Sequence, residues 1–211
     1  MKAITLISEK EDGSMNKVEN ITDYLNKKKI DPDKFVRAEL IHGKKIEIVN
    51  SHDGGTVING VDGLITTSDC VLGVTVADCL PVYISSKRAV GILHAGWKSL
   101  KRGIIEEAIG KITEIGERKE DLEVFIGPSI QSCHFEVKDD LVEKFSDYDN
   151  CFENRDDKIY LNLQKVAKEK LNSNGVKNVK ISKRCTYCDD RLFSYRRDRK
   201  INNMLAVIKP I

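Results

Sequence analysis

The sequence predicts a mixed α/β fold (α+β), namely a single domain with a mixed or largely antiparallel sheet flanked by helices. Short runs rich in β-branched residues alternate along the chain with longer runs whose apolar residues recur at helical intervals. Extended runs also come in pairs around residues 35–50 and 74–93, which favours hairpins over a doubly wound parallel sheet. No repeat, low-complexity tract or linker divides the 211 residues. We therefore expect one domain over residues 1–211.

The individual elements follow from these patterns, taken in chain order. Apolar runs bounded by turn residues predict strands at residues 2–8, 35–41, 45–50, 56–58, 64–67, 74–77, 89–93, 122–126, 179–184 and 204–209. Apolar residues at three- and four-residue spacing predict helices at residues 16–29, 100–115, 139–145 and 163–171. Gly116 is placed to end the second of these helices, and Asn162 to begin the last.

Composition and charge exclude several classes of protein. Lysine and arginine number 35 against 33 aspartates and glutamates, a net charge of +2, which disfavours nucleic-acid binding but leaves room for a small anionic ligand. No apolar run approaches the roughly 18 residues of a membrane span, and residues 3–7 are too short for a signal peptide. We therefore expect a cytoplasmic protein without membrane contact. Its six cysteines are then reduced thiols, metal ligands or catalytic groups.

The stretch from Gly73 to Trp97 places two reactive side chains after apolar strand residues. Cys79 follows one run and His94 follows the next, and a short polar turn at residues 85–88 predicts a hairpin that brings them together. Pro81 removes a backbone donor just after the thiol, which predicts an edge strand or a bulge at this point. By itself the pair fits a nucleophile with its general base.

A third residue changes the chemistry available to this pair. His42, like His94, follows apolar strand residues and precedes a glycine or small turn residue. Together His42, Cys79 and His94 form a three-ligand set for zinc or another transition metal with one open position. Their spacing matches no short motif, and the alternative is two core histidines and a buried thiol. Asp78 is placed as a proton carrier or as a group that orients the ligands.

Two further groups have weaker signals. Cys185 and Cys188 form a Cys-x-x-Cys pair, which suggests a zinc ribbon or a redox motif, but we find no second pair to complete a four-ligand site. If the arginine-rich tail is a strand, alternation sends Arg196 and Arg197 to opposite faces, so one guanidinium could bind a phosphate or carboxylate in a cleft. His52 and His134 are predicted to lie at the surface or behind the site.

Five blocks of sequence together resemble one family. They are Ile41-His42-Gly43, residues 77–82 (ADCLPV), residues 94–97 (HAGW), Gly127-Pro128-Ser129-Ile130 with Phe135-Glu136-Val137, and Cys185-Thr186 with residues 193–198 (FSYRRD). In order and spacing they are similar to the bacterial polyphenol oxidase or multicopper laccase-domain family, also described as purine nucleoside phosphorylases. The similarity runs from about Val18 to the C-terminus.

The resemblance implies a cytoplasmic zinc enzyme of mixed α/β fold that cleaves adenosine and inosine with phosphate. Adenosine deamination and cleavage of methylthioadenosine are also attributed to the family. Its metal ligands correspond to His42, Cys79 and His94. The older laccase label implies copper, but a multicopper oxidase needs many more histidines than the four present.

The sequence departs from the family pattern near its beginning. Residues 11–15 stand where a longer segment with an arginine is usual, and Leu40 stands where a glutamine is usual. These differences bear on substrate identity more than on metal binding. Two other functions remain open, namely a metal-free cysteine hydrolase with Cys79 as nucleophile and His94 as base, and a purine-binding protein without catalysis. The sequence predicts neither the oligomeric state nor the roles of Cys133, Cys185 and Cys188.

Overall fold

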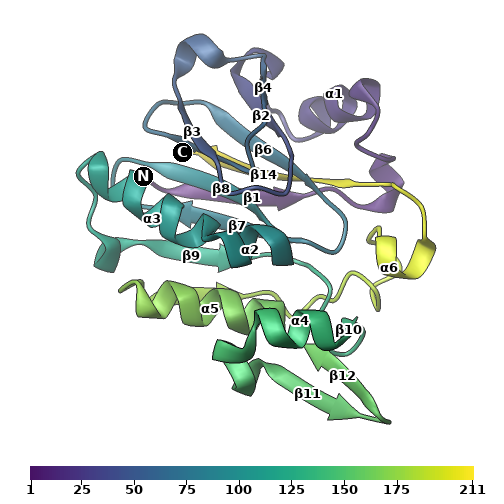
Figure 1. Ribbon diagram of the computed structural model, residues 1–211. Helices are drawn as coiled ribbons and strands as arrows, with labels where there is room; N and C mark the ends of the chain where they lie inside the picture. The colour runs from purple at the N-terminus through teal and green to yellow at the C-terminus, as the bar shows by residue number, and fades with distance from the viewer.

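Two β-sheets stack face to face in the computed structural model, which describes all residues 1–211 (Figure 1). The five-stranded sheet has the order β1 (Ala3–Ile7), β14 (Met204–Pro210), β6 (Val71–Val76), β2 (Phe35–Glu39) and β4 (Val57–Asn59). The six-stranded sheet has the order β13 (Asn178–Ile181), β9 (Glu123–Ile126), β7 (Leu80–Ser85), β8 (Val90–Ala95), β5 (Gly63–Thr66) and β3 (Ile46–Val49). A small third sheet contains β10 (Glu136–Val137), β12 (Lys158–Leu161) and β11 (Phe152–Arg155).

Helices cover the outer faces of the two large sheets (Figure 1). The six-stranded sheet carries α2 (Trp97–Arg102), α3 (Ile104–Glu114) and α5 (Leu163–Ser173), and the five-stranded sheet carries α1 (Val18–Lys27). Two shorter helices complete the fold. Helix α4 (Asp139–Lys144) lies beside the small sheet, and α6 (Tyr195–Asp198) precedes the last strand, β14. Single 3₁₀ turns occupy Lys10–Asp12, Pro32–Lys34, Ser51–Asp53 and Lys119–Asp121, and a longer 3₁₀ segment with a kink at Tyr148 occupies Ser146–Cys151.

Strands with two buried faces explain why so many runs are apolar without alternation. On β14, Met204, Ala206 and Ile208 pack between the sheets, whereas Leu205 and Val207 pack under α1. On β8, Val90 and Ile92 pack between the sheets, whereas Leu93 packs toward the helices. Because successive side chains of a strand point to opposite faces, a strand between two cores is apolar throughout.

The expected fold class is confirmed, since both large sheets contain parallel and antiparallel pairs. The hairpin predicted around residues 74–93 is found over residues 80–95, where β7 and β8 pair antiparallel from Leu80↔Ala95 to Ser85↔Val90. Its first strand begins later than predicted, because residues 71–76 form β6 of the other sheet. The predicted hairpin at residues 35–50 is wrong. Strands β2 and β3 belong to different sheets, and each pairs in parallel with a neighbour of its own sheet.

Three other predictions are corrected by the structure. Pro81 does not mark an edge strand, because β7 is central and its pairing with β9 begins one residue later, at Val82. The helix expected over residues 100–115 is two helices that meet at Gly103, whose φ of 87° only glycine adopts readily. The tail from Tyr195 to Asp198 is a helical turn and not a strand, so the expected alternation of its arginines does not apply.

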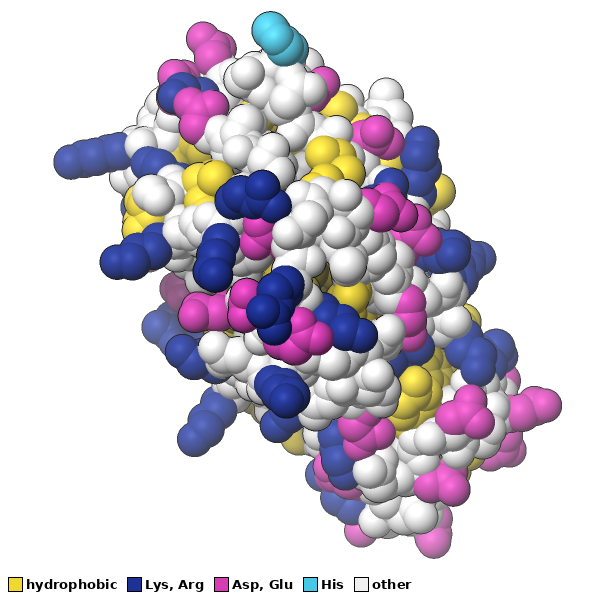
Figure 2. All heavy atoms as spheres, turned by 90° about the vertical axis from the view of Figure 1, so that its left-hand side faces the viewer, with side chains coloured by type: hydrophobic (Ala, Val, Ile, Leu, Met, Phe, Trp, Pro, Cys, Tyr) yellow, Lys and Arg dark blue, Asp and Glu magenta, His cyan; other side chains and the backbone are white.

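The surface agrees with the balanced composition. On the face shown in Figure 2, lysine and arginine side chains are interspersed with aspartate and glutamate and form no continuous basic field. No helix is long and apolar enough to cross a membrane.

We predict that Gly73→Ala destabilises the protein by about 1–3 kcal/mol, the usual cost of overpacking a core. A Cβ atom at Gly73 would lie 2.5 Å from Cζ of Phe35, a ring enclosed beneath α1. The matched control is Gly110→Ala in α3, where a Cβ meets nothing within 4 Å, and which should stabilise by about 0.5–1 kcal/mol. Urea denaturation midpoints measure both changes. Equal stability of Gly73→Ala and wild type would contradict this packing of β6.

Candidate metal centre

The site lies where the chain crosses twice from one sheet to the other. The connection from β2 to β3 carries His42, and the connection from β6 to β7 carries Asp78 and Cys79. His42 and Asp78 both adopt left-handed backbone conformations, with φ of 55° and 76°. Such conformations cost an ordinary residue of the order of 1–3 kcal/mol and concentrate at functional sites. The two crossings therefore bend sharply at the residues that build the site.

The structure brings His42, Cys79 and His94 together. Their candidate ligand atoms all lie within 4.8 Å of one another. The two imidazole rings meet edge to face, with centroids 4.9 Å apart and planes at 90°. His94 is buried on β8 directly across from Pro81, whereas His42 reaches in from an exposed loop. Gly96 leaves room for this approach, because a Cβ there would lie 2.9 Å from Sγ of Cys79.

Asp62, which the sequence analysis did not identify, holds this arrangement in place. Its fully buried carboxylate accepts a hydrogen bond from Nδ1 of His94 at 3.0 Å. It also accepts hydrogen bonds from the backbone N–H groups of Ile41, His42 and Gly43 at 3.3, 2.9 and 2.6 Å. With Nδ1 of His94 held by the carboxylate, Nε2 is the nitrogen left to bind a metal. The only sequence signal was a charged residue between Val61 and Gly63 at the start of an apolar strand.

The charges of the site fit a thiolate beside imidazoles. Burial raises the pKa of Cys79, but the nearby His94 and His42 outweigh burial and lower it to about 6. Burial lowers the pKa of His94, but Cys79 and Asp62 outweigh burial and raise it to about 9. Hydrogen bonds from His94 and Gly43 lower the pKa of Asp62 in spite of its burial. These shifts favour the thiolate of Cys79 and the imidazolium of His94 when no metal is bound, and metal binding would then displace the proton of His94.

A cavity of about 660 Å³ opens onto the three residues. Its volume lies in the range of pockets that bind small molecules. Besides the three donors, the walls include Asp78 and aromatic and basic side chains, which are Trp97, Phe135, Tyr195, Arg37, Lys98, Arg196 and Arg199. A second cavity of about 570 Å³ shares Trp97, Phe135, Arg196 and Arg199 with the first. The two cavities therefore adjoin.

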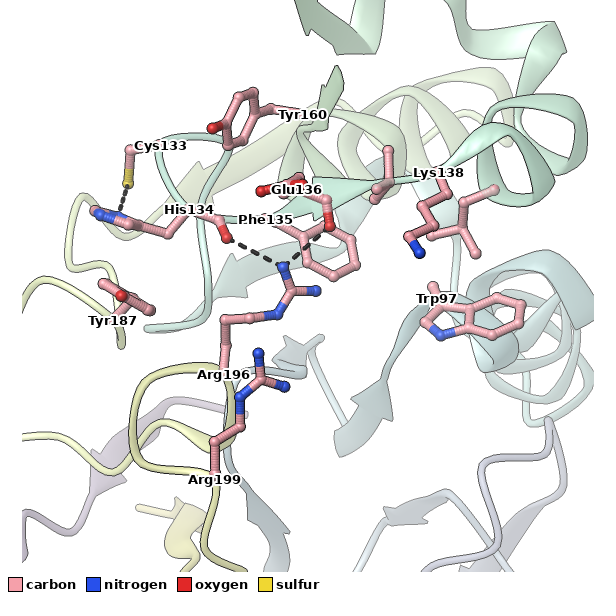
Figure 3. Close-up of a pocket in the computed structure, with 12 residues that line it drawn as sticks. Trp97, Cys133, His134, Phe135, Glu136, Lys138, Tyr160, Tyr187, Arg196 and Arg199 are labelled. Atoms are coloured by element: carbon pink, nitrogen blue, oxygen red, sulfur yellow. Dashed lines mark hydrogen bonds between the residues drawn. The ribbon is translucent and has the colours of Figure 1, made fainter. Parts of the chain in front are cut away.

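The arginines of the tail have different surroundings. Arg196 lies over the ring of Phe135 at 5.2 Å, and its Nη1 donates to the backbone oxygens of His134 and Glu136 (Figure 3). Arg199, which was not predicted, lies beside Arg196 and makes no ion pair. Arg197 does not line either cavity, because its guanidinium is bound to Asp198 and to backbone oxygens, among them those of Thr186 and Leu192.

Asp78 faces the cavity with both carboxylate oxygens already bound. One accepts from Oγ1 of Thr186 at 2.6 Å and the other from the backbone N–H of Arg196 at 2.7 Å. The carboxylate thereby joins the cysteine loop after β13 to the helical turn α6. This arrangement favours orientation of the site over proton transfer as the role of Asp78.

The donor set fits a single catalytic zinc ion. Two imidazoles and one thiolate with a fourth side open to a cavity match the usual pattern of three protein ligands and one exchangeable position. It does not fit a multicopper oxidase centre. Such a centre needs several more imidazoles, and His52 and His134, the other two histidines of the chain, lie outside this cluster.

We predict that Asp62→Asn weakens zinc binding by about 10–100-fold, as loss of a group that orients a ligand usually does. An asparagine amide keeps the shape but loses the charge that holds Nδ1–H of His94. Competition with a chromophoric chelator measures the affinity. The control is Asp69→Asn, an exposed aspartate paired with Lys34, which should bind zinc like wild type. An unchanged affinity of Asp62→Asn would exclude an orienting role for Asp62.

Comparisons with known proteins agree with the resemblance seen in the sequence. Residues 3–210 match the family model described as multi-copper polyphenol oxidoreductase laccase. A purine nucleoside phosphorylase of Aquifex aeolicus is 36% identical over 148 residues, covering 70% of this chain and 69% of that protein. A purine nucleoside phosphorylase of Borreliella burgdorferi is 35% identical over 182 residues, covering 82% and 76%.

Solved structures agree with the fold. The crystal structure of YlmD from Geobacillus stearothermophilus has a TM-score of 0.90 and 27% identity, and the match covers 98% of this chain and 91% of that one. A hypothetical protein YfiH of Bacillus licheniformis has a TM-score of 0.86 and 29% identity, covering 92% and 80%. The chain therefore belongs to the multi-copper polyphenol oxidoreductase laccase family, and the curated relatives it resembles are named purine nucleoside phosphorylases.

Proposed function

We propose that the protein is a zinc-dependent purine nucleoside phosphorylase of the cytoplasm that acts on adenosine and inosine, with methylthioadenosine as a further substrate. The observation that carries the proposal is the His42–Cys79–His94 set, which opens onto a cavity lined by aromatic rings and arginines. The names of the relatives support the reaction class.

Three residues would hold the metal in this proposal. His42, Cys79 and His94 are the ligands, and Asp62 fixes the ring of His94. A zinc ion bound there would supply a Lewis acid that polarises an oxygen or lowers the pKa of a bound water. The remaining contribution of the protein is to place a nucleoside and an anion against each other.

The aromatic residues suit the nucleoside, and the arginines suit the phosphate. Trp97, Phe135 and Tyr195 offer ring faces and edges for a purine. Arg196 and Arg199 lie together on one side of the adjoining cavity, with Trp97 and Lys138 opposite them (Figure 3). Guanidinium groups bind phosphate oxygens in pairs and hold the nucleophile in a fixed direction. Arg199 has no competing carboxylate and is our choice for the principal phosphate ligand.

In phosphorolysis one bond forms and one breaks. A phosphate oxygen bonds to C1′ of the ribose while the bond from C1′ to N9 breaks. The electron pair of that bond leaves with the purine, which takes up one proton, so the products are ribose 1-phosphate and the free base. Water in place of phosphate would give other outcomes, namely hydrolysis at C1′ or deamination at the amino-bearing carbon of adenosine.

The product pattern tests the proposal directly. Zinc-loaded protein incubated with adenosine should release adenine and ribose 1-phosphate only when phosphate is present, as resolved by chromatography. The His42→Ala variant should lose this activity, because one of three ligands is missing. Inosine formed without phosphate would make deamination the main reaction. Full phosphorolysis after complete metal removal would exclude a catalytic role for the metal. Binding of adenosine without any product would favour a purine-binding protein without catalysis.

A variant of Arg199 tests the phosphate site. We predict that Arg199→Gln raises the KM for phosphate about tenfold, since a charge-assisted hydrogen bond contributes about 1.5–3 kcal/mol and this one is partly screened by solvent. The KM for adenosine should change little. The matched control is Arg118→Gln. Arg118 is 74% exposed and lines neither cavity, so its substitution should change neither constant. Equal effects on both substrates would indicate damage to the whole cavity.

One observation favours the alternative of a metal-free cysteine hydrolase. The lowered pKa of Cys79 and the adjacent His94 are also what a nucleophile and its base require. The two hypotheses differ in what zinc does to the thiol. A ligand becomes unreactive when zinc binds, whereas a nucleophile that works without metal stays reactive.

We predict that alkylation of Cys79 in metal-free protein follows its lowered pKa. The thiolate is the reactive form, so labelling should be fast above about pH 6 and slow as the pH falls below that value. The buried Cys151, which belongs to neither group of candidate ligands and whose pKa burial raises to about 12, should stay unlabelled over this pH range and serves as an internal control. Mass spectrometry of labelled peptides separates the two sites. Added zinc should protect Cys79, and continued labelling of Cys79 in zinc-saturated protein would favour the hydrolase.

A further inference from the structure

A second cluster of metal-binding side chains lies beside the first. The sequence offered no partner for the Cys185 and Cys188 pair, but the structure places Cys133 and His134 against it. The cause is the pairing of β9 with β13. These strands are parallel neighbours, so their carboxyl ends meet at one edge, and the bridge from Ser129 to Cys185 continues that alignment. Two loops remote in sequence therefore deliver two donors each.

The distances within the cluster are close to those of a tetrahedral site. Sγ of Cys133 lies 3.5 Å from Sγ of Cys185 and 3.6 Å from Sγ of Cys188. Nδ1 of His134 lies 3.3 Å from Sγ of Cys133 and 3.2 Å from Sγ of Cys188. Zinc–sulfur bonds of about 2.3 Å and zinc–nitrogen bonds of about 2.0 Å at tetrahedral angles give sulfur–sulfur edges of about 3.8 Å and sulfur–nitrogen edges of about 3.5 Å, slightly longer than the distances in the structure. All four atoms lie within 4.8 Å of one another.

Neighbouring groups prepare these donors. The ring of His134 stacks on Tyr187, with centroids 3.9 Å apart and planes at 13°, which fixes the direction of Nδ1. The backbone N–H of Gln131 points at Sγ of Cys185 at 3.5 Å. A backbone amide turned toward a buried sulfur favours the thiolate, the form that binds metals.

We propose that Cys133, His134, Cys185 and Cys188 bind a structural zinc ion, separate from the metal at His42, Cys79 and His94. Three thiolates and one imidazole fill a tetrahedron and leave no position for substrate or water, which is typical of structural sites. None of the six cysteines forms a disulfide, and the sulfurs lie too far apart for the bond of about 2.05 Å.

The ion would brace the wall of the active cavity. Thr186, between the two cysteines of the pair, donates to Asp78, the neighbour of Cys79. The backbone oxygen of His134 accepts from Arg196, which lines both cavities. Two hydrogen bonds therefore connect the cluster to Asp78 and Arg196, which line the cavity at His42, Cys79 and His94.

Metal content is the first test. Wild-type protein purified with zinc should contain two equivalents by mass spectrometry of the metal, and the double variant Cys133→Ser with Cys188→Ser should contain one. His42→Ala should also lose one equivalent, from the other site. The control is Cys151→Ser. Cys151 is buried, its thiol donates to the side chain of Asn150, and it belongs to neither cluster, so this variant should keep two equivalents of zinc. One equivalent in wild type, unchanged in the double variant, would overturn the proposal.

Thiol labelling of wild-type protein tests the proposal without a substitution in this cluster. Cys188 is exposed, so an unligated thiol there should react with an alkylating agent in the native state. We expect Cys188 and Cys133 to be protected in zinc-loaded protein and to become labelled after chelation. Cobalt substitution of His42→Ala should give the absorption of a tetrahedral thiolate complex. Labelling of Cys188 that is equally fast with and without zinc, or a Cys133–Cys188 disulfide in its place, would refute the second site.

Discussion

The carboxylate of Asp62 is the interaction on which the site depends. It is fully buried, and a buried charge is tolerated only where donors surround it. Those donors come from two places, the crossing loop at residues 41–43 and the ring of His94 on β8. One group therefore fixes both histidines, His42 through its backbone and His94 through its side chain. Because each donor would lose its partner if the carboxylate were removed, the loop and the strand keep their positions together.

The stacked sheets explain why the site forms at this place. A chain that builds two facing sheets must cross between them. The backbone N–H and C=O groups of the crossing segments cannot pair with a neighbouring strand, so they need other partners. At these points the backbone turns sharply, and His42 and Asp78 adopt left-handed conformations. Residues there are held by other groups: the carboxylate of Asp62 accepts from the backbone N–H of His42, and the hydroxyl of Thr186 donates to the carboxylate of Asp78. Two of the three candidate ligands, His42 and Cys79, lie on these crossings, and the third, His94, lies on strand β8. Functional residues on loops that a rigid scaffold positions are common in enzymes.

Local patterns predicted most elements, but not how the strands pair. Periodicity located α1, α5 and β8, because each reflects neighbours close in sequence. It could not show that β2 and β3 lie in different sheets, since both runs are apolar and short. Likewise, His42, Cys79 and His94 were named from apolar context and family resemblance, whereas Asp62 resembles any turn aspartate. His134 was predicted to lie at the surface or behind the site. Its grouping with Cys188, 54 residues along the chain, could not be predicted from local pattern, because it depends on the pairing of β9 with β13.

The two cysteine-containing clusters both join segments that are far apart in the sequence. Each cluster includes residues from loops, and each loop residue that is fixed costs conformational entropy of about 1–2 kcal/mol. At the first cluster, the buried carboxylate of Asp62 binds both the loop at residues 41–43 and the ring of His94. At the second, the sulfur atoms of Cys133 and Cys188 lie against each other and against the imidazole of His134, and Cys188 is exposed. Three thiolates this close would repel one another, so a bound cation would add more order at the second cluster than at the first, which suits the structural role proposed there and the exchangeable position proposed at His42, Cys79 and His94.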